Sequence, residues 1–416
     1  MAKIKNALVE LNPWWKERYR AEFKERDIYE TIQKFMALPQ IIALTGLRRV
    51  GKTTIMMKMT EDMIAAGAQP RDIIYFSFDE FRDVPIRELI SAYEELTEKS
   101  IKEGTHLLLL DEIQKLNAWE DQLKGFYDTY KKHVKIVISG SESLFIRKKS
   151  KETLAGRMFE FKVEPLTFKE FLKFKQVDLK PMGIYEKELT KLFSQFILTM
   201  GFPELVEIKD KEIIKKYVQE GLVEKIIYRD IPGLFKIKDT SVLESLLHIL
   251  MEEPGQLIEI SKLANELNIS RQTASSYLTY LEESFLLRKL YNFSRNKRKV
   301  ERKLKKYYPT AISVDLLFKD DDFSRSKIFE WLIVNQLKAE YFWRDPYKNE
   351  VDIITADEKP LPIEIKYGKI DFSGLLAFMK KFNVDEGCIV SYHQEETKKI
   401  NGKTIRVIPA FKYLLK

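Results

Sequence analysis

Four short apolar runs alternate with amphipathic segments in the first part of the chain. The runs are Ile41 to Leu44, Ile73 to Phe76, Leu107 to Leu110 and Ile136 to Ile138, and helical patterns separate them. Continuous apolar strands with helical crossovers are typical of a parallel sheet covered on both faces. We therefore predict such a sheet, preceded by a charged helical segment over residues 14–38.

The pattern changes around Pro165. Residues 166–235 are helical in pattern, with a break at Gly201-Phe202-Pro203. Residues 241–291 then predict three helices, with a tight turn before the third, and a strand, an order typical of a winged helix. The last segment predicts a helix from Ile328 to Phe342 followed by strand, turn, strand, helix and strand.

The fold class predicted from these patterns is multidomain α/β. Its parts are a parallel sheet, a helical segment, a winged helix and a C-terminal α/β segment. The expected bounds are 1–165, 166–235, 236–310 and 311–416, which agrees with the two to four domains that this length allows.

Composition restricts the classes of protein to consider. The longest apolar runs are far shorter than the ~20 residues needed to cross a bilayer, and the opening residues lack the pattern of an export signal. The lone Cys388 excludes an intramolecular disulfide, and we expect a cytoplasmic protein without a membrane partner. The net charge of +8 permits a nucleic-acid partner without requiring one, because Lys- and Glu-rich surfaces also mark heat-stable proteins.

A phosphate-binding loop follows the first apolar strand. Residues 46–53 match G-x-x-x-x-G-K-[ST] between a strand and a helix. The glycines allow a tight turn whose N–H groups point into one concavity, which the helix N-terminus completes as an anion site. Lys52 should reach the β- and γ-phosphates, and the Thr53 hydroxyl should hold Mg²⁺. The alternative is a chance match to the motif, but such a match rarely has both a strand before it and a helix after it. The residues expected to bind ATP are Gly46, Arg49, Gly51, Lys52, Thr53, Thr54 and Ser139.

Two adjacent acids end the third apolar strand. Ligands of open α/β sheets bind at the carboxyl ends of the strands, where Asp111 and Glu112 are expected. Asp111 would hold Mg²⁺ through water, and Glu112 would polarise the attacking water. The alternative is a strand edge with a solvated turn. A small-molecule kinase is disfavoured, because its own substrate supplies the nucleophile.

Four further residues are less specific. Ser139 follows the next strand, where it could sense the γ-phosphate or belong to an ordinary turn. Arg157 is a candidate arginine finger, a cation that offsets transition-state charge. Arg48 and Arg49 either contact phosphate or a neighbouring chain, or are solvated.

These residues occur in blocks that are familiar together. The blocks are Gly46 to Thr54, Leu110 to Gln114, Ile138 to Ser141, Leu154 to Arg157, Pro165 to Phe171, Gly201 to Glu204 and Tyr228 to Ile231. They resemble the archaeal and bacterial AAA+-type ATPase family. This resemblance implies a P-loop parallel sheet with a helical lid, a winged helix and a C-terminal α/β nuclease-like domain. The resemblance implies binding of ATP and Mg²⁺ and strengthens the prediction for Arg157, but it implies no particular biological role.

The winged helix is a candidate DNA-binding element. The third helix of such a fold enters the major groove, so the groove-facing candidates are Arg271, Gln272, Thr273 and Ser275. Basic residues over 295–306, among them Lys297, Arg298 and Lys299, would contact phosphates. The alternative is a module that packs or docks protein, with the charged run facing solvent.

The last segment contains a possible nuclease site. Asp352 on one predicted strand, and Glu364 with Lys366 on the next, should lie on one face because side chains alternate along a strand. This trio resembles the D…E-x-K site of restriction-endonuclease-like nucleases, and Glu330 could complete it. The carboxylates would bind a second Mg²⁺ or Mn²⁺ that activates water. The alternative is an amphipathic hairpin with a solvated ion pair.

Two functions follow from these predictions. The first is a Mg²⁺-dependent, AAA+-type ATP hydrolase that binds DNA and remodels or processes it. The second is a nucleotide-operated regulatory switch whose winged helix and C-terminal domain bind protein or DNA without cutting. In both cases we expect a homo-oligomer, and a protein partner is compatible with either.

Overall fold

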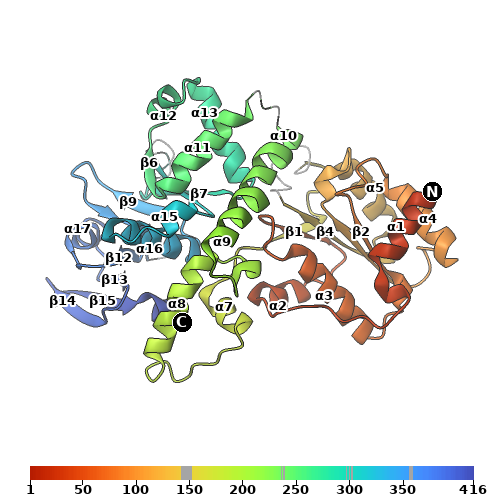
Figure 1. The fold of residues 1–416 in the computed structure, drawn as a ribbon, viewed down its shortest axis with the longest axis horizontal. Coiled ribbons are helices and arrows are strands. Elements are labelled where there is room, and N and C mark those ends of the chain that lie inside the picture. The colour runs from red at the N-terminus through yellow and green to blue at the C-terminus, as the bar shows by residue number, and fades with distance from the viewer. Residues whose placement is uncertain are drawn as a thin grey trace. The chain divides into compact units, whose positions relative to one another are not determined.

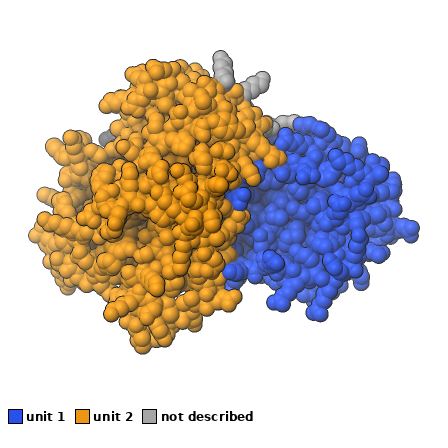
Figure 2. All heavy atoms as spheres, viewed as in Figure 1, with its two compact units in different colours: residues 1–165 blue, residues 166–416 orange. Residues whose placement is uncertain are grey.

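The computed structural model describes residues 1–141, 152–235, 237, 239–296, 298, 300, 303–355 and 359–416. The chain divides into two compact units, residues 1–165 and residues 166–416 (Figure 2). No helix within the described ranges is long and apolar enough to span a membrane.

The first unit is built on a five-stranded parallel sheet in the order β2-β3-β4-β1-β5. The four predicted strands are confirmed, and the sheet has one more strand after the 154–157 block. The strands are β1 (Ile41–Thr45), β2 (Ile73–Ser77), β3 (His106–Asp111), β4 (Val134–Gly140) and β5 (Met158–Lys162). Every residue of β1 and β3 is buried, which explains their uninterrupted apolar sequence.

Helices cover both faces of this sheet (Figure 1). On one face α1 (Ala2–Leu11), α4 (Ile86–Thr97) and α5 (Trp119–Tyr130) enclose a core with alternate residues of the strands. Helix α3 (Lys52–Ala65) contacts β3 and β4. The predicted helix over residues 14–38 is wrong in its bounds, because only α2 (Asp27–Gln33) and a 3₁₀ turn at Pro13–Trp15 are helical there. The remaining 3₁₀ turns are Pro70–Asp72 and Ile113–Lys115.

The second unit begins with helices, as its pattern predicts. They are α7 (Phe168–Phe174), α8 (Glu186–Thr199), a 3₁₀ turn at Pro203–Leu205, α9 (Lys211–Val218), π turns at Gln219–Val223 and Ile226–Asp230, and α10 (Ile231–Leu234). A capping box at Thr167 and Glu170 starts α7. The left-handed residues Met200 and Gly201 end α8 and produce the predicted break.

The three helices predicted over residues 241–291 are confirmed. They are α11 (Thr240–Glu252), α12 (Ile260–Glu266) and α13 (Arg271–Glu283), and the strands around them are β6 (Gln256–Ile258), β7 (Leu287–Asn292) and β8 (Lys305–Pro309). Strand β8 pairs with both β6 and β7 in antiparallel fashion. The hydroxyl of Ser270 accepts a hydrogen bond from Thr273 N and caps α13.

The remaining residues continue the same sheet and add a second one. Strands β9 (Tyr341–Arg344) and β10 (Glu350–Val351) extend the sheet of β6, β7 and β8 through a parallel β7–β9 pair. The second sheet has the order β11-β12-β13-β15-β14. Its strands are β11 (Ile353–Ile354), β12 (Pro362–Lys366), β13 (Glu386–Ser391), β14 (Glu396–Ile400) and β15 (Lys403–Pro409), with helices α15 (Val314–Leu317), α16 (Asp322–Gln336), α17 (Ser373–Phe382) and α18 (Ala410–Tyr413) beside them.

The helix predicted from Ile328 to Phe342 is shifted in the structure. Helix α16 begins earlier, at Asp322, because the Asp321 carboxylate caps it by accepting from Ser324 N. It ends at Gln336, and Tyr341 and Phe342 belong to β9.

Candidate functional site

The phosphate loop has the backbone that its sequence requires. Gly46 has φ +143°, and a Cβ at this position would lie 2.2 Å from Val163 O, so only glycine fits where β1 passes the end of β5. Gly51 has φ +96° and immediately precedes α3. The loop therefore turns tightly into the N-terminus of α3, where helix dipole and free N–H groups favour an anion.

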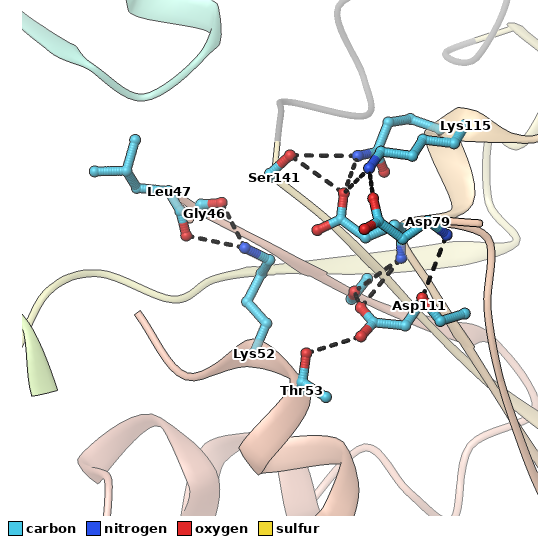
Figure 3. Close-up of polar contacts among 12 residues, drawn as sticks. Gly46, Leu47, Lys52, Thr53, Asp79, Asp111, Lys115 and Ser141 are labelled. Carbon is cyan, nitrogen blue, oxygen red and sulfur yellow. Dashed lines mark hydrogen bonds and ion pairs between the residues drawn. The ribbon is translucent and has the colours of Figure 1, made fainter. Parts of the chain in front are cut away.

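The polar side chains of the loop gather at this turn (Figure 3). Lys52 is buried and its Nζ donates to Gly46 O and Leu47 O, both at 2.9 Å, so the ammonium lies inside the curve of the loop. Thr53 and Thr54 are exposed on the first turn of α3, and Arg48 and Arg49 are half-buried.

Asp111 lies at the carboxyl end of β3, as predicted, and four groups hold its carboxylate. Thr53 Oγ1 and Tyr75 Oη each donate to Oδ2 at 2.8 Å. Ser139 Oγ donates to Oδ1, which also accepts from Glu112 N at 3.1 Å. A hydroxyl and a carboxylate in contact beside the phosphate loop fit a Mg²⁺ site, because Mg²⁺ prefers oxygen ligands and is bound through one or two carboxylates.

Burial and the neighbouring Asp111 charge raise the pKa of the Tyr75 phenol. The phenol therefore stays protonated and donates to Asp111. Tyr75 was not predicted as a site residue, because an aromatic residue in an apolar strand has the same pattern as a core residue.

Glu112 is positioned by a backbone conformation that is uncommon for its residue type. Its φ is +54°, in the left-handed region, directly after β3. Gln114 Nε2 donates to its Oε2 at 2.7 Å, Ser141 Oγ donates to the same oxygen at 3.4 Å, and Lys115 Nζ lies 3.9 Å away while pairing with Asp79. Figure 3 shows this network beside the Asp111 carboxylate.

Two predicted roles do not agree with the geometry. Ser139 is fully buried against Asp111, so its hydroxyl orients that carboxylate and has no surface to offer a γ-phosphate. Arg157 lies at the opposite edge of the sheet: its carbonyl accepts from the N–H of Ile41, the first residue of β1, and its guanidinium pairs with Asp128 at 2.9 Å. The phosphate loop follows the last residue of β1, so Arg157 cannot reach a nucleotide bound to its own chain. The role of Arg157 as an arginine finger stays a prediction.

An arginine outside every predicted motif supports the loop. The guanidinium of Arg26 is buried and donates to Val50 O and to Glu164 O, both at 2.7 Å. Its Nη1 also lies 3.7 Å from the position that a Cβ would occupy if one were added to Gly51. The side chain thus links the phosphate loop to the chain that leaves β5. In sequence it stands within a run of exposed charges, which gives no sign of its burial.

The structure describes some of the predicted DNA-binding residues. Arg271, Gln272 and Ser275 are exposed on α13, whereas Thr273 is half-buried against Ser270. Arg298 is exposed in the connection between β7 and β8. Lys297 and Lys299 lie outside the described residues.

One end of the predicted basic run is not available to DNA. Lys306 lies in β8 with a side chain only 6% exposed, and Glu330, Glu350 and Asp352 surround its ammonium. The expectation that residues 295–306 contact phosphates is therefore wrong for Lys306.

The four predicted nuclease residues do come together. Asp352 lies in the break between β10 and β11 instead of within a strand, and its Oδ2 accepts from Ile365 N at 2.8 Å. Lys366 Nζ donates to Glu364 Oε1 at 2.7 Å, and Glu330 faces the same cluster through Lys306. Within the described ranges, however, no group of three or more His, Cys, Asp or Glu residues is arranged to hold a metal ion. The expected second metal is not supported by this arrangement.

Comparison with known families places domains along the chain. Residues 38–172 match the AAA domain, residues 190–313 match a domain of unknown function (DUF8612) and residues 326–413 match another (DUF4143). The chain thus carries an AAA domain followed by these two domains, and the AAA domain implies binding of ATP and Mg²⁺.

Relatives occur in archaea and bacteria. An uncharacterized protein of Methanocaldococcus jannaschii is 27% identical over 90% of this chain and 86% of its own length. One from Haemophilus influenzae is 29% identical over 65% of this chain and 67% of its own.

Among solved structures, two similar chains are AMPPCP-bound DnaA from Aquifex aeolicus and Cdc6p from Pyrobaculum aerophilum. The first has 17% identity and a TM-score of 0.31, covering 64% of this chain and 90% of its own. The second has 14% identity and a TM-score of 0.32, covering 77% and 97%. Scores this low carry no argument about function.

Proposed function

We propose that this protein is a Mg²⁺-dependent ATPase that binds DNA and remodels it. The observation that carries the proposal is the meeting of Lys52, Thr53, Asp111 and Glu112 at the carboxyl edge of one parallel sheet. The AAA-domain match over the same residues supports it.

Each group has a distinct part in hydrolysis. The loop N–H groups and Lys52 bind and orient the β- and γ-phosphates. Thr53 and Asp111 would hold Mg²⁺, which offsets charge on the phosphates. Glu112 accepts a proton from the attacking water, once its Oε2 exchanges the Gln114 amide for that water. Tyr75 and Ser139 keep the Asp111 carboxylate in one orientation.

Steady-state ATP hydrolysis, measured with and without a panel of single-stranded, duplex and branched DNA, tests the proposal. We expect hydrolysis that needs Mg²⁺ and rises with at least one DNA structure, and its loss in Lys52→Ala. Hydrolysis that survives this substitution would exclude the phosphate site. An ATPase that no DNA structure of this panel stimulates would favour a switch that acts on protein.

Binding to DNA is assigned to α13 and the connection between β7 and β8. The support is the exposure of Arg271, Gln272 and Arg298. Neutralising Lys297, Arg298 and Lys299 together should weaken binding to all sequences. It should also flatten the salt dependence by about one unit for each phosphate that the protein no longer touches. Equal binding by the triple variant and the parent at every salt concentration would show that these three residues do not bind DNA.

A nucleotide-operated switch that grips DNA or protein without cutting is the second candidate. The presence of Lys306 among the carboxylates of the predicted nuclease site favours it. Incubation of branched, nicked and single-stranded DNA with the protein and Mn²⁺ tests the second candidate. Cleavage that is lost in Asp352→Ala and Glu364→Ala would exclude it, because a switch does not cut.

A further inference from the structure

Lys306 occupies the centre of the acidic cluster in the C-terminal part of the chain. Its Nζ lies 2.5 Å from Glu350 Oε1, 3.4 Å from Glu330 Oε1 and 4.0 Å from Asp352 Oδ1. The lysine comes from β8 of the winged helix, whereas the acids come from α16, from β10 and from the break that follows it. A cation with three carboxylates around it takes the position that a shared metal ion would need.

Three more side chains pair with carboxylates of the cluster. Arg344 pairs with Glu350 Oε2 at 2.8 Å, and Lys366 pairs with Glu364 Oε1 at 2.7 Å. Tyr308 donates to Glu330 Oε1 at 2.5 Å. Glu364 Oε2 is buried and has no hydrogen-bond partner among the described residues.

The charges of the cluster do not leave room for a divalent ion. Four carboxylates (Glu330, Glu350, Asp352 and Glu364) face three cations (Lys306, Arg344 and Lys366), so the sum is 3 − 4 = −1. A divalent ion would turn this sum to +1, an uncompensated charge beside largely buried side chains, which is costly. Without Lys306 the sum would be −2, which matches a divalent ion.

We infer that Lys306 is the resident cation of this cluster: it replaces the metal that the D…E-x-K pattern implies and ties the wing strand β8 to the C-terminal sheet. The ion pairs of the cluster then connect the two parts of the second unit, and the cluster binds no Mg²⁺ or Mn²⁺. This inference does not depend on the ATPase proposal.

Binding of Mn²⁺ to the full-length, nucleotide-free protein, followed by electron paramagnetic resonance of free Mn²⁺, tests it. The set comprises the parent, Lys306→Met, Asp352→Asn and the double variant. Lys305→Met is a matched control, because Lys305 is the preceding lysine of the same strand and lies over the Tyr291 ring. Any Mn²⁺ bound at Asp111 is common to all five proteins and cancels.

We expect the parent, Asp352→Asn and Lys305→Met to bind Mn²⁺ alike. Lys306→Met should gain about one Mn²⁺ per chain, held by carboxylates, and the double variant should lose it again. Binding of Mn²⁺ by the parent that disappears in Asp352→Asn would overturn the inference. A folded Lys306→Met variant that binds no more Mn²⁺ than the parent would also overturn it. If Lys306→Met does not fold, comparison of the parent with Asp352→Asn still decides the question.

Discussion

The hydroxyl of Tyr75 provides a sensitive probe of the ATP site. It donates from a buried position to Asp111 Oδ2 at 2.8 Å. Hydrogen bonds to charged groups contribute about 1.5–3 kcal/mol, and neutral ones about 0.5–1.5 kcal/mol. Tyr75→Phe should therefore lower the free energy of unfolding of the first unit by about 1.5–3 kcal/mol. Because groups that orient a metal ligand affect metal binding about 10–100-fold, the Mg²⁺ concentration for half-maximal ATPase activity should rise by that factor.

A matched control is available in the same unit. Tyr93 is fully buried and its hydroxyl donates to a neutral acceptor, Arg71 O, at 2.9 Å. Tyr93→Phe should cost only about 0.5–1.5 kcal/mol and leave the Mg²⁺ dependence unchanged. Urea unfolding, with hydrogen exchange on peptides of residues 1–165, measures both free energies. Equal losses in the two variants, or an unchanged Mg²⁺ requirement in Tyr75→Phe, would refute the orienting role of Tyr75.

Three further outcomes follow from the structure. Arg26→Ala should weaken ATP binding about tenfold or more, which corresponds to about 1.4 kcal/mol of binding free energy or more. Substitution of the exposed Arg20 by Ala should leave ATP binding unchanged. Equal ATP titration curves for the two variants would contradict the supporting role of Arg26. Because the pKa of Asp352 is raised in the folded state, its stabilising contribution is present below the ordinary value of 3.8 and is lost as the pH rises. The free energy of unfolding should consequently fall less steeply above pH ~4 in Asp352→Asn than in the parent, and identical slopes in urea titrations would count against it. Burial raises the pKa of the Cys388 thiol to about 11, so a disulfide reagent at pH ~8 should react only after unfolding, and immediate reaction would contradict that burial.

The sequence predicted the sheet and the acids at its edge because local chemistry determines both. Four consecutive leucines between two helical patterns favour a strand buried on both faces, and Asp111 then falls at its carboxyl end. The same reasoning failed for Ser139, because a strand buried on both faces gives no sign of which polar side chain reaches solvent. The position of Arg157 could not be predicted because β5 was not recognised, so the block of residues 154–157 that precedes this strand could not be assigned to an end of the sheet.

Long-range packing explains what pattern could not predict. Lys306 stands at the end of a basic run, and its burial follows from the approach of α16 and β10, which lie later in the chain. Arg26 is likewise surrounded by charged residues in sequence, yet Val50 and Glu164 close around it in the fold. In both cases the partners are distant in sequence, and local charge patterns predicted a solvated side chain.

Glu112 is the proposed activator of water for hydrolysis of an ATP held by Lys52 and Asp111. ATP binding and phosphate release by Glu112→Gln, measured in parallel with the parent, test this role. We predict that the variant binds Mg²⁺–ATP as tightly as the parent but releases phosphate about 10²–10⁴-fold more slowly. Phosphate release at the parental rate by a variant that still binds ATP would show that Glu112 does not activate the water.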